Sequence, residues 1–110
     1  MSQEEFVVVL VTASSSDEAM NIASALVEEH LAACANVVGP IRSIYRWKEA
    51  VEDAEEQLLV IKARASDFAA IEARVRELHG YELPEVIALP LRTGSAPYLE
   101  WLAEATSRER

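Results

Sequence analysis

Two stretches near the middle of the chain, IRSIYRWK (residues 41–48) and QLLVIKAR (residues 57–64), decide the fold, because both have the composition of long β-strands. In the first, the period of two that a strand imposes places Tyr45 and Trp47 on the same face. In the second, the run Leu58–Ile61 is apolar without a break, so both of its faces require cover. We therefore expect a long hairpin at the centre of the fold.

The length of this hairpin predicts an oligomer. At ~3.3 Å per residue each strand runs about 30 Å or more, which is near the width of a small domain. The far end of the hairpin, with its aromatic side chains, should therefore overhang the core of its own chain. A ribbon with exposed edges and an aromatic face needs a partner, and we expect that partner to be further copies of the chain.

The segments before the hairpin predict a strand, a helix and a second strand. Phe6–Thr12 is apolar, β-branched and too short for a helix, so we expect a central strand buried on both faces. Ser15, followed three residues later by Glu18, has the form of a capping box, and apolar residues at helical spacing continue the helix to about Ala33. A short strand should follow from Cys34, with a bulge or kink at Gly39-Pro40 before the long hairpin.

The segments after the hairpin predict a second helix, a fourth strand and a third helix. Ser66 or Asp67 can cap the second helix, and Gly80 is suited to end it in a left-handed conformation. Residues 85–91 are extended, residues 97–106 form a short helix that buries Tyr98, Trp101, Leu102 and Ala105, and residues 107–110 are frayed.

This order of elements, β-α-β-β-α-β with a C-terminal helix, indicates an α+β fold. Right-handed crossovers convert the order into a four-stranded antiparallel sheet with both long helices on one face, which is the ferredoxin-like arrangement. The 110 residues, 51% of them hydrophobic, fit a single domain that spans residues 1–110.

Charge and cysteine content restrict the partners and the compartment. The formal net charge of −9 argues against nucleic acid and against an anionic membrane as partners. Cys34 is the single cysteine, which suits a reducing compartment. Residues 1–5 lack the positive region of a signal peptide, and the longest apolar run, Phe6–Val11, is too short to cross a membrane. We expect a cytoplasmic protein.

Several residues could bind a metal ion, each with a structural alternative. His30 and Cys34 are four residues apart and offer soft ligands for zinc or copper, but a lone cysteine at a helix end is commonly buried packing. His79, at the end of the second helix, could be a ligand or a helix cap. The acidic residues between 49 and 56 lack calcium-loop spacing and favour a solvated hairpin tip. No nucleophile elbow or glycine-rich phosphate loop is present, so we expect no enzymatic activity and no required cofactor.

Taken together, five stretches resemble the CutA family of divalent-ion tolerance proteins. They are LVTA (residues 10–13), ALVEEHLAAC (25–34), SIYRW (43–47), LHGYELPEVIALP (78–90) and YLEWL (98–102). The resemblance covers nearly the whole chain in order. It implies a ferredoxin-like fold that assembles as a homotrimer through the long hairpin strands, similar in build to the PII signalling proteins, and an association with tolerance of copper and other divalent cations.

The resemblance also implies where ligands bind. His79 and Cys34 match the copper-site histidine and cysteine of the family, and Glu85 is the carboxylate partner that we expect beside them. The remaining cleft residues that we expect between subunits are Lys62, Tyr81, Tyr45 and Trp47. The leading interpretation is a non-catalytic trimer that binds divalent metal, copper or zinc, or a small ligand. The alternative is a structural or signalling trimer whose ligand is a protein or a metabolite.

Overall fold

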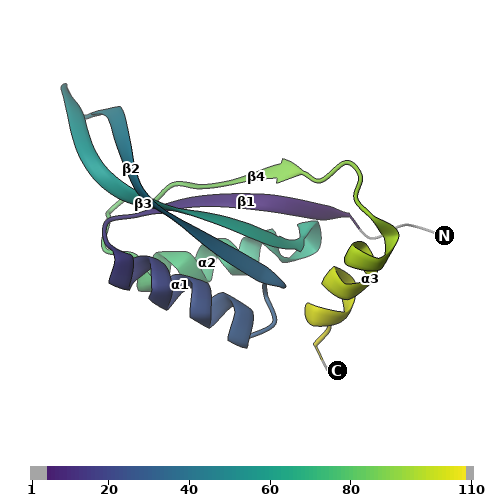
Figure 1. Ribbon diagram of the computed structural model, residues 1–110. Helices are drawn as coiled ribbons and strands as arrows, with labels where there is room; N and C mark the ends of the chain where they lie inside the picture. Colours follow the sequence, from purple (N-terminus) through teal and green to yellow (C-terminus); the bar gives the residue numbers. More distant parts are fainter. Residues whose placement is uncertain (1–4, 109–110) are drawn as a thin grey trace.

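The computed structural model describes residues 5–108 as a four-stranded antiparallel sheet with two long helices on one face (Figure 1). In chain order the elements are β1 (Phe6–Ala13), α1 (Ser16–Glu28), β2 (Cys34–Trp47), β3 (Ala50–Arg64), a 3-10 turn (Ala65–Asp67), α2 (Phe68–Leu78), β4 (Val86–Pro90) and α3 (Ala96–Ala105). The strand order in the sheet is β2-β3-β1-β4. The α+β, ferredoxin-like architecture expected from the sequence is confirmed.

The core lies between the sheet and the pair α1 and α2. Val9 and Val11 of β1 are fully buried against this layer, together with Ile22 of α1 and Ile71 of α2. Val8 and its alternate neighbours on β1 are only partly buried, because both long helices cover the same face of the sheet (Figure 1). The expectation that β1 is buried on both faces is therefore wrong for a single chain.

The opposite face of the sheet, which we call the open sheet face, is apolar where β1 pairs with β4. The register pairs Val8 with Leu89, and Leu10 with both Val60 and Ile87, so these side chains share that face. Leu89 and Ile87 are about half exposed, at 49% and 48%. A single chain thus leaves a sheet face of aliphatic side chains without cover.

The hairpin is longer than its sequence suggested. β3 begins at Ala50, not at Gln57, so the acidic segment is strand and not loop. β2 continues through Gly39-Pro40 with a register shift between Val38 and Ile41. The overhanging half of the ribbon has solvent on both sides, which is why acidic side chains are tolerated there. Lys48, with φ of 56°, supplies the left-handed residue of the tight turn.

Helix α1 ends at Glu28, earlier than the expected Ala33, because His30 adopts φ of 62°. The N–H groups of Leu31 and Ala32 then turn back to the carbonyl oxygen of Leu26, which caps the helix without a glycine. His30 and Cys34 therefore do not share a helix face. The Nδ1 atom of His30 instead lies 3.1 Å from the carbonyl oxygen of Ala105.

The ends of the other two helices also differ from expectation. No glycine in residues 5–108 has a positive φ, so Gly80 does not end α2 in the way predicted. Asp67 precedes α2, but its carboxylate pairs with Arg108, 2.7 Å away, and caps no helix N–H. Arg108 is thus anchored, not frayed, whereas residues 109–110 lie outside the described range.

Helix α3 buries less than its sequence predicted. Leu102 is fully buried, but Tyr98 and Trp101 are 39% and 42% exposed, with their ring centroids 5.3 Å apart. The expected burial of these two rings is wrong within one chain, because α3 lies at the end of the sheet and only one of its sides faces protein (Figure 1). Within residues 5–108, no helix has the length and apolar character needed to cross a membrane.

Candidate functional site

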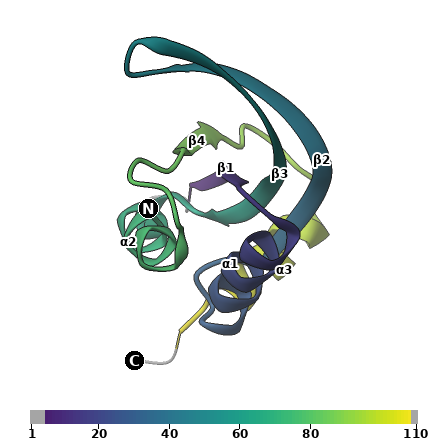
Figure 2. The same ribbon diagram turned by 90° about the vertical axis from the view of Figure 1, so that its left-hand side faces the viewer.

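The curved end of the hairpin forms one wall of a groove. Viewed along the sheet, β2 and β3 arch over the edge that carries β4 (Figure 2). Residues 80–87, which lead from α2 into β4, form the opposite wall, and the open groove between the walls has a volume of about 1060 Å³. The lining residues are Thr12, Ser43, Ile44, Tyr45, Arg46, Trp47, Glu52, Glu56, Gly80, Tyr81, Glu82, Leu83, Pro84, Glu85, Val86 and Ile87.

The hairpin wall of the groove combines aromatic rings with carboxylates. Tyr45 pairs with Glu52 across the two strands, so both side chains lie on the same face of the ribbon. Trp47 and Glu56 fall on that face by the same alternation. The shared face predicted for Tyr45 and Trp47 is confirmed, and it is the face that lines the groove.

A hydrogen bond joins the two walls at the base of the groove. The Tyr81 hydroxyl donates to the Glu56 carboxylate at 2.9 Å, and Glu56 is only 4% exposed. Burial, reinforced by the Glu56 carboxylate, raises the pKa of Tyr81 far above its ordinary value, so the phenol remains protonated. This bond fixes the segment after α2 to the hairpin where the ribbon leaves the sheet.

His79 lies beneath this base and braces it. Its side chain is fully buried, with Nε2 2.6 Å from the carbonyl oxygen of Thr12 and Nδ1 3.0 Å from the backbone N of Tyr81. A carbonyl can only accept and an N–H can only donate, so the ring is neutral with its proton on Nε2. The rings of His79 and Tyr81 are also in contact, at 4.8 Å between centroids.

Glu18 connects the start of α1 to the same segment. Its carboxylate accepts hydrogen bonds from the N–H of Ser14 and the N–H of Gly80, both at 2.8 Å, and lies 3.7 Å from Nε2 of His79. Burial acts to raise the pKa of Glu18, but the hydrogen bonds from Ser14 and Gly80 outweigh it, so the pKa is lowered.

The other two predicted site residues lie elsewhere. Lys62 and Cys34 are paired across β3 and β2, and both contact the Oδ1 atom of Asn36. They are outside the groove, on the part of the sheet that α3 approaches. Of the seven predicted residues, the structure therefore brings Tyr45, Trp47, Tyr81 and Glu85 together, places His79 behind them, and separates Lys62 and Cys34.

Two residues that organise the site, Glu56 and Glu18, were not predicted from the sequence as site residues. Glu56 was assigned to a solvated hairpin tip. The period of two along β3 could have identified it, because Glu56 lies two residues before Leu58 and therefore on the same face of the strand. Glu18 was interpreted only as part of a capping box, and its reach to Gly80 depends on the fold.

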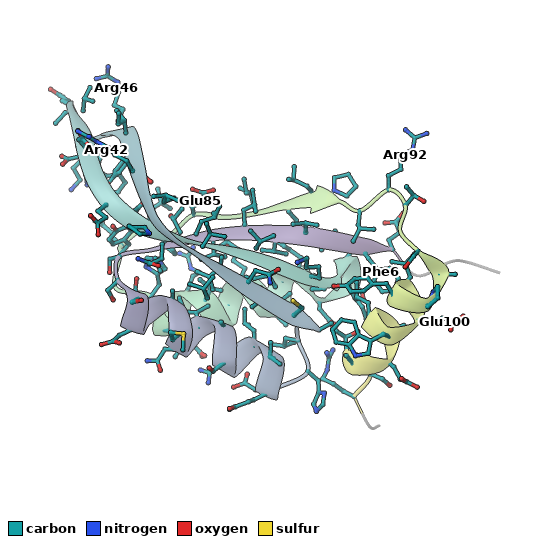
Figure 3. The ribbon with its side chains drawn as sticks, in the orientation of Figure 1. Phe6, Arg42, Arg46, Glu85, Arg92 and Glu100 are labelled. Carbon is teal, nitrogen blue, oxygen red and sulfur yellow. The ribbon has the colours of Figure 1, made fainter. Side chains whose placement is uncertain are left out.

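The groove does not form a compact metal centre within one chain. Among residues 5–108, no group of three or more histidine, cysteine, aspartate or glutamate side chains is close enough to hold a metal ion. The carboxylates are distributed along the walls, with Glu85 on the β4 side (Figure 3). What the arrangement offers chemically is an elongated anionic surface interrupted by aromatic rings.

Comparison with known proteins assigns the chain to a family. A family model described as the CutA1 divalent ion tolerance protein matches residues 7–105. The divalent-cation tolerance protein CutA of Thermus thermophilus is 48% identical over 99 residues, which are 90% of this chain and 96% of that protein. The chloroplastic CutA of Arabidopsis thaliana is 43% identical over 91% of this chain, and the match spans 55% of the plant protein, about half its length.

Solved structures agree with the sequence matches. The T. thermophilus divalent cation tolerance protein superimposes with a TM-score of 0.89 and 47% identity, covering 96% of this chain and all of that one. A protein titled the periplasmic divalent cation tolerance protein CutA of Archaeoglobus fulgidus gives a TM-score of 0.88 at 34% identity, covering 96% of this chain and all of that one. The chain therefore belongs to the CutA1 divalent ion tolerance protein family.

Proposed function

We propose that this protein is a cytoplasmic homotrimer that supports tolerance of divalent cations, copper among them, by binding a cation or a small ligand in the groove, without catalysing a reaction. The observation that carries the proposal is the open sheet face. Leu89 and Ile87 are half exposed beside Val8 and Leu10, and the hairpin extends beyond its own sheet. Further copies of the chain can cover this face and place the groove at a boundary between subunits.

Solution mass tests the assembly. Light scattering should give three times the 12.2 kDa of one chain. The substitution Leu89→Lys puts a charge on the open sheet face and should shift the solution mass toward that of a single chain. Met20→Lys is the matched control, because Met20 is 57% exposed on α1, on the far side of the molecule. A folded wild-type monomer, or equal dissociation in both variants, would contradict the assignment of this face.

Metal binding is proposed at the β4 side of the groove. Glu85 is exposed there and can provide a hard oxygen ligand, whereas His79 can provide a softer nitrogen only after its ring leaves Thr12 or Tyr81. Cys34 would be a metal ligand at a second, separate position, beside Lys62 on the neighbouring strand. Calorimetric titration of Cu²⁺ and Zn²⁺ into wild type, Glu85→Gln, His79→Gln and Cys34→Ser separates these ligands. A variant whose isotherm equals that of the wild type removes its residue from the metal site.

The second candidate, a structural or signalling trimer similar to PII proteins, is favoured by the distribution of the groove carboxylates. They are not gathered into a three-ligand metal group within residues 5–108, and an elongated groove suits a ligand larger than an ion. Copurification of a small molecule or a protein with the intact trimer, combined with weak metal isotherms, would support this alternative.

The cytoplasmic location is supported by the single cysteine, Cys34, which requires no oxidising compartment. The relatives differ in this respect, since one carries a chloroplastic and another a periplasmic name. Cell fractionation of the expressed chain tests the location. Recovery from a periplasmic or membrane fraction would refute it.

A further inference from the structure

Lys62 places a positive charge on the open sheet face. It is paired with Val8 on β1 and with Cys34 on β2. Its neighbours along β3, Ile61 and Ala63, are fully buried in the core beneath the sheet, so the Lys62 side chain leaves the strand on the opposite side. The proposed assembly covers this face with further copies of the chain, and the ammonium group is then carried into a subunit boundary.

Within residues 5–108 this ammonium group meets an amide and no carboxylate. The Nζ atom of Lys62 donates to Oδ1 of Asn36, and no aspartate or glutamate of that range forms an ion pair with it. Arg64, the next cation along β3, donates instead to Thr106 at the end of α3. An ammonium group that loses water without meeting an opposite charge is costly to bury. A copy that covers Lys62 should therefore bring a carboxylate to it.

Glu85 provides a carboxylate at the other end of the same face. Ile87 and Leu89 of β4 lie on the open sheet face, and Glu85 continues their alternation by two residues. Figure 3 shows Glu85 on the side of the sheet away from α1 and α2. Its side chain is exposed, and no residue of the described chain is hydrogen-bonded or ion-paired to it. Glu85 is therefore available to a neighbouring copy.

Lys62 and Glu85 are too far apart to pair within one chain. Val8 is in register with both Lys62 and Leu89, so Glu85 lies four residues further along β4 and two strands away from Lys62. At ~3.3 Å per residue and ~4.8 Å per strand, the two backbones are separated by about 16 Å. These unlike charges at opposite ends of one face can therefore meet only between copies.

We propose that Lys62 of each copy forms an ion pair with Glu85 of the next, and that this pair fixes the register between subunits. The strand order β2-β3-β1-β4 places Lys62 beside one edge of the sheet and Glu85 at the other. A head-to-tail contact between these edges repeats once per subunit and can close into a ring. The inference rests on the proposed function in taking further copies of the chain as the cover of the open sheet face.

An exchange of the two charges tests the pair. Lys62→Glu and Glu85→Lys each place like charges across the subunit boundary. Each should lower the urea midpoint of dissociation, followed by light scattering at a fixed protein concentration, by about 1–2 M. The double variant Lys62→Glu/Glu85→Lys restores opposite charges and should recover most of the wild-type midpoint. Urea is the denaturant because it is uncharged and does not screen an ion pair as a salt does.

Two reversals on the helices are the matched controls. Arg76→Glu on α2 and Glu28→Lys on α1 change the net charge by the same amounts as the two test variants, and both side chains are exposed. Each control should leave the midpoint within about 0.5 M of the wild type. Circular dichroism without urea shows whether each variant is folded. Lys62→Gln removes the charge without adding repulsion, should give a smaller shift in the same direction, and replaces Lys62→Glu if that variant does not fold.

The outcomes distinguish the ion pair from the proposed homotrimer. A trimeric wild type whose double variant is no more stable than the single variants would overturn the ion pair and leave the homotrimer standing. Test variants that shift no more than the helix controls would do the same. Recovery by the double variant in an assembly of two or four copies would contradict the homotrimer and leave the ion pair standing. A folded wild-type monomer would contradict both.

Discussion

Replacing Tyr81 by phenylalanine tests the bond that holds the two walls of the groove together. The change removes one hydroxyl and leaves Glu56, which is 4% exposed, without the donor at 2.9 Å. A hydrogen bond to a charged group contributes about 1.5–3 kcal/mol, and Tyr81 is only half-buried, so the loss should be near the lower end, about 2 kcal/mol. The ring contact with His79 is retained, so the effect belongs to the hydroxyl.

Guanidinium unfolding at a fixed protein concentration measures this loss. With a slope of about 3–5 kcal/mol per M for a chain of this size, the midpoint should fall by about 0.4–0.7 M. Protein concentration is held constant because association contributes to the apparent stability. The matched control is Tyr98→Phe, since Tyr98 is 39% exposed and its hydroxyl is not buried against a carboxylate. This control should not move the midpoint.

The pH dependence sharpens the test. The pKa of Tyr81 is raised in the folded state, so the stabilisation from its protonated phenol is complete below the unfolded value near 10 and is lost only as the pH rises through the folded value. The difference between wild type and Tyr81→Phe should therefore be constant from about pH 6 to 9. Equal midpoints for Tyr81→Phe and Tyr98→Phe would refute the structural role of this bond.

Three further predictions follow from the same geometry. Glu18→Gln should cost about 1–2 kcal/mol at pH 7. Because the folded pKa of Glu18 is lowered, its contribution is complete above the unfolded pKa and is lost as the pH falls through the folded pKa, so the midpoint difference from wild type should shrink in acid. Arg108→Lys should lower the midpoint by an amount equivalent to about 1–2 kcal/mol, since one ammonium cannot replace the two-pronged contact with Asp67, and Arg76→Lys should leave it unchanged. Leu26→Ala should cost about 2–5 kcal/mol in the same assay, because Leu26 is fully buried between α1 and the sheet; a cost below 1 kcal/mol would contradict its place in the core.

The order of elements could be predicted because each core segment carries a clear periodic pattern. The boundaries that were wrong lie where that pattern stops. Helix α1 ends through the left-handed backbone of His30, and nothing in a histidine specifies φ of 62°. The start of β3 at Ala50 was not predicted because both faces of the overhanging ribbon are exposed in a single chain. The acidic segment therefore lacks the alternation of apolar and polar residues that marks a strand.

The site was predicted in part for a similar reason. Tyr81 and Glu85, which are close in sequence to recognisable motifs, lie on the groove, and their role in binding stays a prediction. The burial of His79 and the hydrogen bond from Tyr81 to Glu56 depend on which segments the fold brings together. The sequence around each residue does not specify these contacts. Lys62 contacts Asn36 on the neighbouring strand, which the alternation of β3 alone cannot show, and its place in a cleft between subunits stays a prediction.

The hairpin also has a consequence for the path by which the chain folds. Its two-residue turn, Lys48-Glu49, brings Trp47 opposite Ala50, so pairing can start there at little cost in chain entropy and extend one residue pair at a time toward the core. The pairing of Val11 with Leu59 must instead close a loop that contains α1 and the whole of β2. We therefore expect the insertion of β1 between β3 and β4 to be slower than pairing within the ribbon, so that the part of the sheet furthest from the core forms first.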